Sequence, residues 1–200
     1  VQYSTAADPP AGILTTATFA QVRDFDLSTG KQVEVGSKFD FLDGRGAATV
    51  AAYHIERKNL ATADPANPGF TQPVGKQSSR GVEVAASLHV TPQLLAEGNV
   101  AYVDAQYDEF NENVAGTSVS RKGNTPTNIP ERVANLWLTY DIDPNWQVGG
   151  DSRYVSSVYA DAANTRHAPS YTIFGAFVGY KLDADTRITA RVRNLTDEVY

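Results

Sequence analysis

The chain has 200 residues, of which 42% are hydrophobic and 20% are charged, and its formal net charge is −6. This balance excludes an intrinsically disordered chain, and the acidic net charge argues against a nucleic-acid partner. The sequence contains no cysteine, which excludes disulfides, thiolate nucleophiles and cysteine-bound metals. No apolar run approaches the roughly 18 residues of a transmembrane helix.

The clearest predicted element is an amphipathic strand at residues 32–42. Val33 and Val35 share one side of it, while Glu34 and Lys38 share the other. Alternation with a period of two predicts a β-strand with one apolar and one polar side.

The next strand begins near Thr49. We place Tyr53 and Ile55 on its apolar side and His54 and Glu56 on its polar side. Further strands are expected at residues 1–4, 82–90, 94–106, 135–142, 146–159 and 174–182 and from Arg187 onward. The pattern therefore predicts nine strands and no helix.

Strand length helps to separate a membrane sheet from a soluble β-sandwich. The predicted strands at residues 32–42, 94–106 and 146–159 run about 11 to 14 residues, whereas strands of globular sheets most often have about 5–6. A strand tilted near 45° needs about 9–11 residues to cross the membrane hydrocarbon. The length therefore favours a membrane-spanning sheet.

Short and long connections alternate along the chain. The short turns lie at residues 43–46, 91–93, 143–145 and 183–186, and the long loops at residues 5–30, 59–77, 108–130 and 160–169. In an up-and-down sheet every second connection emerges on the same side, so the short turns share one rim and the long loops share the other. Bacterial outer-membrane barrels have this layout. We therefore predict an all-β, antiparallel up-and-down transmembrane β-barrel segment.

Aromatic residues lie near most predicted strand ends, where outer-membrane barrels carry aromatic girdles. An ordinary preference of tyrosine for strands explains the same pattern equally well. The residues are Tyr3, Tyr53, Tyr107, Trp146, Tyr154, Tyr159, Tyr171 and Tyr200.

No motif of a catalytic centre or metal site is present in the sequence. The histidines His54, His89 and His167 are far apart, and none has metal-ligand spacing. We place His54 and His89 on polar strand sides that line a lumen. The chain is therefore expected not to be an enzyme and to hold no catalytic residue, resident metal or cofactor.

Four arginines fall on the polar side of the last strands by parity: Arg153, Arg187, Arg191 and Arg193. Buried charges need partners. We expect these arginines to bond either to neighbouring carboxylates or to carboxylates of a domain inside the barrel.

Several stretches together resemble one known family. They are residues 30–38 with 41–45, 52–59, 79–84 with 91–92, 128–132 with 136–137, 153–155 with 169–172, and 193–200. In this order they resemble the C-terminal half of TonB-dependent outer-membrane receptors of the ferric-siderophore class, and they cover essentially the whole chain.

The resemblance implies a barrel of about 22 strands that surrounds a plug. Residues 1–200 would be the C-terminal portion of this barrel domain. The plug, the TonB-contacting box and the final strand are not among these 200 residues.

The resemblance also implies a function: uptake of a ferric siderophore across the outer membrane of a Gram-negative bacterium, energised by the TonB complex through the plug. Iron would then be carried as substrate, and lipid and lipopolysaccharide would be the surroundings. Family members bind their ligand with aromatic, arginine and polar groups at the barrel mouth. The corresponding candidates are Phe70, Tyr107, Phe110, Arg121, Tyr159, Arg166 and His167, and the competing interpretation for each is a solvated loop residue or a lipopolysaccharide contact.

Three alternatives stay open at this point. A receptor of the same family can take cobalamin, haem or a saccharide instead. A passive porin or autotransporter barrel would conduct without a specific substrate, and a soluble β adhesin would partition into the aqueous phase.

Overall fold

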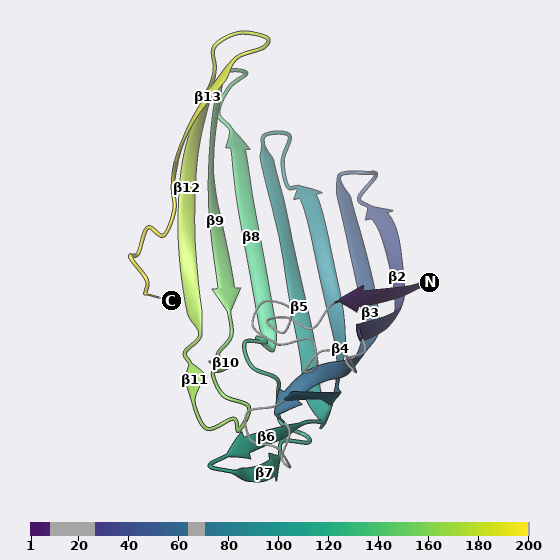
Figure 1. The fold of residues 1–200 in the computed structure, drawn as a ribbon. Coiled ribbons are helices and arrows are strands. Elements are labelled where there is room, and N and C mark those ends of the chain that lie inside the picture. The colour runs from purple at the N-terminus through teal and green to yellow at the C-terminus, as the bar shows by residue number, and fades with distance from the viewer. Residues whose placement is uncertain (9–26, 64–70, 200) are drawn as a thin grey trace.

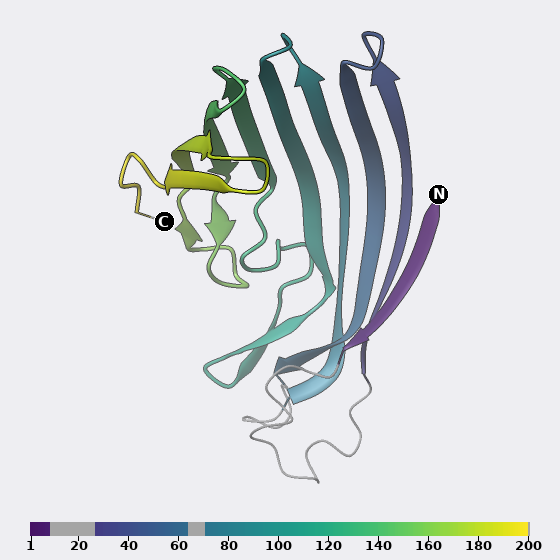
Figure 2. The ribbon, with the colours of Figure 1, turned by 90° about the horizontal axis from the view of Figure 1, so that it is seen from above.

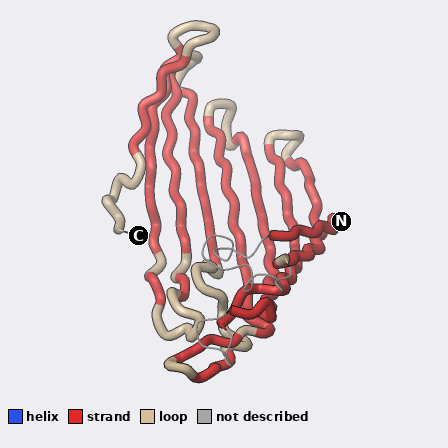
Figure 3. The backbone as a smooth tube through the Cα atoms, in the orientation of Figure 1, coloured by secondary structure: helices blue, strands red, loops and turns tan. Residues whose placement is uncertain are grey.

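A computed structural model describes residues 1–8, 27–63 and 71–199, and the side chains of 61–63 and 71–74 are not described. Phe70, Tyr200 and most of the first predicted long loop therefore lie outside the described residues. Every regular element of the described chain is a strand, as the red segments of Figure 3 show. Within the described residues, no helix is long and apolar enough to cross a membrane.

Nine strands form one antiparallel sheet in sequence order, which confirms the predicted up-and-down topology (Figure 1). They are β1 (Gln2–Asp8), β2 (Ser28–Phe41), β3 (Gly46–Ala63), β4 (Thr71–His89), β5 (Leu94–Glu109), β8 (Arg132–Asp141), β9 (Trp146–Val155), β12 (Tyr171–Lys181) and β13 (Arg187–Val192). Two small hairpins lie in the long connections: β6 (Asn111–Val114) with β7 (Thr117–Ser120), and β10 (Val158–Tyr159) with β11 (His167–Ala168).

The short turns lie together at the top of Figure 1 and the long connections at the bottom. We call these ends the turn rim and the loop rim. Side chains within the turns explain why the chain reverses there. The Asp143 carboxylate accepts hydrogen bonds from the backbone N–H groups of Asn145 and Trp146, both at 2.8 Å. Asp183 binds the N–H groups of the last turn in the same way.

The strands of the N-terminal half are longer than predicted. β3 has 18 residues and β4 has 19, whereas β8 and β9 have 10 each. β3 and β4 stay paired beyond Arg57 through register shifts, and Asn59 has a positive φ of 57° at that point. A bulge interrupts the alternation of apolar residues, so the sequence pattern placed a loop where pairing continues.

Cross-strand partners point to the same side of a sheet, so the register defines its two faces. Val33 pairs with His54, and Glu34 pairs with Tyr53. The apolar face of β3 therefore carries Val50 and Ala52, and the sides predicted for this strand were wrong. The reason is the alanine-rich centre of β3, which alternates weakly, so Tyr53 and Ile55 near the loop rim dominated the pattern. His54 accordingly lies on the apolar face rather than lining a lumen.

The apolar face is exposed along the sheet. The exposed fraction is 56% for Val35, 55% for Val100 and 45% for Leu136. Both views show one curved layer of strands (Figures 1 and 2). A sandwich would bury this face against a second sheet. This exposure agrees with the predicted membrane sheet, in which lipid rather than a second sheet would cover the apolar face.

The apolar band is close in height to the band of about 25 Å on outer-membrane barrels. On β5 it runs from Leu94 to Tyr102, which is about 27 Å of strand, or about 21 Å along the normal at a tilt of about 40°. Trp146 and Tyr180 lie on this face near the turn rim with ring centroids 4.6 Å apart. Tyr154 lies on it nearer the loop rim.

Other aromatic residues differ from the predicted girdle. Tyr53, Tyr107 and Tyr171 lie on the polar face by register. Tyr159 lies in a loop hairpin. A residue near a strand end therefore belongs to the girdle only if its side chain points to the apolar face. Alternate residues of a strand point to opposite faces, so nearness to the end is not enough.

A charge placed on the apolar face should be far more harmful than the same charge on the polar face. Val84 lies in the middle of the band between Val50 and Val100, and its neighbour Ala85 faces the other side. Val84→Arg in the intact protein should lower the free energy of unfolding by about 2–4 kcal/mol, measured by urea unfolding in lipid vesicles. Ala85→Arg is the matched control. Equal losses for the two variants would contradict the assignment of the faces.

Candidate functional site

The buried apolar core of the described chain lies at the loop rim. Ala105, Tyr107 and Val155 are its buried apolar residues, with exposed fractions of 6–7%. Strand β5 is longer than its neighbour β8, which begins opposite Tyr102. The extra length of β5 gives the long loops a surface on which to pack.

The loop before β8 follows the free part of β5. Tyr107 N donates to Asn124 O at 2.9 Å, Gly123 N donates to Tyr107 O at 2.8 Å, and Val103 N donates to Glu131 O at 2.8 Å. Between these contacts, residues 125–130 bulge away from residues 104–106. The bulge contains Pro126 and Pro130, which have no N–H to donate to a ladder.

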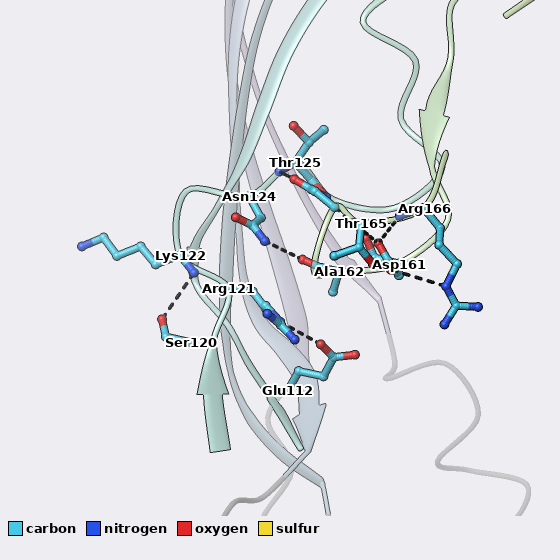
Figure 4. A network of polar contacts seen from close by, with 11 residues as sticks. Glu112, Ser120, Arg121, Lys122, Asn124, Thr125, Asp161, Ala162, Thr165 and Arg166 are labelled. Carbon is cyan, nitrogen blue, oxygen red and sulfur yellow. Dashed lines mark hydrogen bonds and ion pairs between the residues drawn. The ribbon is translucent and has the colours of Figure 1, made fainter. Parts of the chain in front are cut away.

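The bulge is joined to the loop that follows β9. The Asn164 side chain bonds Thr125 twice: its Oδ1 accepts from Thr125 N at 2.8 Å, and its Nδ2 donates to Thr125 O at 2.9 Å. Asn124 Nδ2 donates to Ala162 O at 2.8 Å, and Asn128 N donates to Tyr159 O at 3.0 Å. Figure 4 shows the two loops meeting in this polar network.

Asp161 organises the second loop. Its carboxylate accepts from the N–H groups of Thr165 at 2.8 Å and Arg166 at 3.3 Å, and from the Thr165 hydroxyl. The bond from the Thr165 hydroxyl is the largest cause that lowers the pKa of Asp161, and the backbone N–H groups and the Arg166 charge add to it against desolvation. The charged carboxylate is therefore the form that holds the turn.

A pocket of about 430 Å³ lies between β5 and the two loops. Tyr102 and Asp104 come from β5, Thr125 and Glu131 from the first loop, and Tyr159 and His167 from the hairpin β10–β11.

The two carboxylates of the pocket have arginine neighbours. Asp104 forms an ion pair with Arg80 at 2.8 Å, and Glu131 forms one with Arg132 at 3.4 Å. Both carboxylates are about half exposed, at 47% and 50%.

The predicted ligand residues fall into two groups. Tyr159 and His167 line the pocket together. Tyr107 and Phe110 instead stack on each other with centroids 4.3 Å apart, and Arg121 binds Glu112 at 2.7 Å.

Arg166 and Phe70 complete the predicted set. The Arg166 side chain is 85% exposed and lies 3.8 Å from Asp161. Phe70 lies outside the described residues.

The sequence prediction missed the residues that join the loops. Asn124 and Asn164 carry no signal of partnership, because their contacts are 38 and 39 residues away along the chain. Asp104 and Glu131 were also missed. A positive φ of 59° at Asn164 is typical of asparagine, but it becomes visible only in the fold.

Arg153, Arg187 and Arg191 of the predicted inner arginines lie on the polar face by register, and Arg193 follows the end of β13. Arg191 pairs in register with Phe177, lies over its ring at 5.4 Å, and has Nη2 3.9 Å from Asp151 Oδ1. Arg187 donates to Gln147 Oε1 at 2.7 Å. Within the described ranges, Arg153 and Arg193 have no ion-pair partner, so no described carboxylate neutralises their charges.

The glycines of β9 and β12 let side chains lie flat on this face. A Cβ at Gly149 would stand 2.2 Å from the Phe177 ring and 2.6 Å from Leu138 O, and one at Gly175 would meet Asp151 at 2.7 Å. The close packing at Gly149 is thus made by the two neighbouring strands, β8 and β12.

Comparisons with known proteins give a consistent result. A family model described as "TonB dependent receptor-like, beta-barrel" matches residues 1–195. The Metal-pseudopaline receptor CntO of Pseudomonas aeruginosa is 34% identical over 88% of this chain and 25% of its own length. The Ferrichrome outer membrane transporter/phage receptor of Escherichia coli is 33% identical over 88% of this chain and 24% of its own.

Solved structures agree with the sequence relatives. The siderophore receptor PiuA from Acinetobacter baumannii matches with a TM-score of 0.81 and 26% identity, over 98% of this chain and 29% of that one. The chain thus spans about a quarter of the length of the curated relatives it matches.

Replacing glycine by alanine should destabilise the protein more at Gly149 than at the adjacent Gly150. Gly149→Ala should lower the free energy of unfolding by about 1–3 kcal/mol because Phe177 and Leu138 O must move. Gly150→Ala, whose Cβ would meet its nearest atom at 3.4 Å, is the control and should cost much less. Thermal unfolding of the intact protein measures both, and equal melting temperatures would contradict the packing.

The Asp161 turn should resist acid. Because the folded pKa is lowered, the charged carboxylate stabilises the turn above the ordinary range of about 4, and this stabilisation is lost only as the pH falls through the lowered pKa. Hydrogen exchange of the Thr165 and Arg166 amides, corrected for intrinsic rates, should show protection down to about pH 4. Asp161→Asn should reduce that protection at neutral pH, whereas Asp183→Asn on the turn rim should not. Loss of protection already at mildly acidic pH would count against this role.

Proposed function

Since this chain belongs to the TonB-dependent receptor-like β-barrel family, we propose that it forms part of a receptor that imports a ferric siderophore. Proteins of this family lie in the outer membrane of Gram-negative bacteria, and its members are receptors and transporters. The relatives named above are a metal-pseudopaline receptor, a ferrichrome transporter and a siderophore receptor. We therefore propose transport rather than catalysis.

The observation that carries this proposal is that the sheet has one apolar face, one polar face and a rim of long loops with a pocket. The apolar face anchors the wall in lipid. The polar face would line the interior, and the loop rim, with the pocket between β5 and the two loops, would face the outside of the cell. Such a wall holds a ligand on one side of the membrane and guides its passage without contact between lipid and polar groups.

Iron would arrive as cargo inside its chelator. The protein then recognises the organic groups of the siderophore, by hydrogen bonds and aromatic contacts, and Tyr159 and His167 are the described candidates at the rim.

Arg153 and Arg193, which have no ion-pair partner among the described residues, suggest a second set of contacts. We propose that Arg153 and Arg193 meet carboxylates of a domain inside the barrel, because buried charges are costly without partners. Energy from the TonB complex would act through that domain. Lipopolysaccharide and outer-membrane lipid would surround the apolar face.

Uptake of radioactive iron tests the function. The full-length gene would be expressed in a Gram-negative strain that lacks its own siderophore receptors, and ferrichrome and ferrioxamine B loaded with ⁵⁵Fe would be supplied. We expect uptake that needs both the receptor and TonB. Uptake that persists without TonB or the proton gradient would contradict the proposal and indicate a passive channel.

A further inference from the structure

Two long connections lie next to each other at the loop rim. The first loop, residues 121–131, leads into β8, and the second loop, residues 156–170, follows β9 and contains the hairpin β10–β11. Because β8 pairs with β9, with Val133 opposite Val155, both loops leave the sheet at the same place. They connect different pairs of strands, so the strand ladder does not require them to move together.

The first loop is bonded to β5 at its two ends. Tyr107 N donates to Asn124 O at 2.9 Å at one end, and Val103 N donates to Glu131 O at 2.8 Å at the other. Between these ends, the pocket of about 430 Å³ separates residues 125–130 from β5. Among the described residues, no hydrogen bond joins β5 to this middle part. Hydrogen bonds from the wall therefore do not hold the middle of the first loop.

All three hydrogen bonds that the described structure shows for residues 125–130 go to the second loop. Asn164 Oδ1 accepts from Thr125 N at 2.8 Å, and Asn164 Nδ2 donates to Thr125 O at 2.9 Å. The third bond runs from Asn128 N to Tyr159 O at 3.0 Å. The middle of the first loop is thus held by the second loop at two points.

The second loop keeps its shape through its own hydrogen bonds. Tyr159 pairs with His167 in the β10–β11 hairpin, and the Asp161 carboxylate binds the backbone N–H groups of the turn that follows it. Asn164 lies in this turn with a φ of 59°, which asparagine tolerates. A loop that is ordered in this way holds Asn164 and the Tyr159 carbonyl in fixed positions relative to each other.

A fourth bond between the loops lies at one end of the first loop. Asn124 Nδ2 donates to Ala162 O at 2.8 Å (Figure 4). Asn124 is also the residue whose carbonyl accepts from Tyr107 of β5. This end stays on the wall while the middle of the loop moves, so it would act as the hinge.

We propose that the first and second loops form one lid over this cavity, which opens as a single unit, and that Asn164 couples the two loops. If the middle of the first loop leaves β5 together with the second loop, the three bonds of residues 125–130 are kept. If it leaves alone, all three are broken. The joint movement is therefore the less costly one. This inference goes beyond the proposed function and does not depend on which ligand is imported.

Amide hydrogen exchange of the full-length receptor in lipid nanodiscs, resolved to single residues, tests the coupling. Asn164→Gly removes both bonds to Thr125 and keeps the backbone freedom that a positive φ needs. The informative amide is that of Asn128, which is bonded to Tyr159 and not to Asn164. We expect Asn164→Gly to raise the exchange rate of this amide about tenfold, because two hydrogen bonds between the loops are lost. The Gly123 amide, which is bonded to β5, should exchange as in the wild type.

Asn194 provides the matched control. Its φ is also positive, at 53°, and its side chain also pairs in both directions, with Glu198 N at 2.9 Å and Glu198 O at 3.0 Å. These bonds lie within one turn and join no second loop. Asn194→Gly should therefore speed exchange at Glu198 and leave the Asn128 amide at its wild-type rate.

Distances between spin labels test the movement itself. Labels on cysteines introduced at Thr127 and Ala168 report on the two loops, and labels at Thr127 and Gln106 report on the first loop and β5. A lid that opens as a unit gives a narrow distribution between the loops and a broad one between the first loop and the strand. In Asn164→Gly the distribution between the loops should broaden as well.

The outcomes that overturn this inference differ from those that overturn transport. An unchanged Asn128 rate in Asn164→Gly means that the loops are not coupled, and an equal rise at Gly123 means that the whole first loop is loosened. A narrow distribution from Thr127 to Gln106 means that the lid does not open. These measurements need no ligand, so any of these results together with normal iron uptake overturns the lid alone. Failed uptake with the expected exchange and distances overturns the proposed function alone.

Discussion

Backbone hydrogen bonding is the constraint on which the rest of this structure depends. In hydrocarbon an unpaired N–H or C=O group costs several kcal/mol, so each strand must be paired along its length. The seven inner strands meet this demand by pairing with a neighbour on each side in antiparallel order, and β1 and β13 each pair on one side within the described sheet. Once the strands are fixed in this way, parity alone assigns each side chain to lipid or to the interior.

The two faces then follow different rules. The apolar face tolerates almost any apolar residue, because lipid fills its gaps, and Val35, Val84 and Leu136 are simply exposed to it. The polar face has more specific packing. Gly149 has no side chain and so leaves room for the Phe177 ring, over which the Arg191 guanidinium lies.

The candidate site lies at the loop rim, where side-chain hydrogen bonds rather than strand pairing hold the long loops in place. Strand β5 extends past β8, and this step in the wall supports the bulge at residues 125–130. Asn164 and Asn128 then fasten the bulge to the next loop through backbone groups of Thr125 and Tyr159. A pocket built in this way can change its specificity by loop substitutions while the membrane sheet stays the same.

The sequence by itself determined the strands, their order, the two rims and most of the faces, because a period of two and polar turns such as the one at Asp143 are local signals. It failed on the faces of β3, where alanines weaken the alternation, and on the lengths of β3 and β4, where a bulge hides the pairing. Only the tertiary structure decided the candidate site. Tyr159 and His167 come together with Asp104 through contacts almost 40 residues apart in sequence, whereas Tyr107 and Arg121 are taken up by packing within the rim. Long-range contacts of single polar side chains leave no periodic trace in a sequence, and the folded loops alone reveal them.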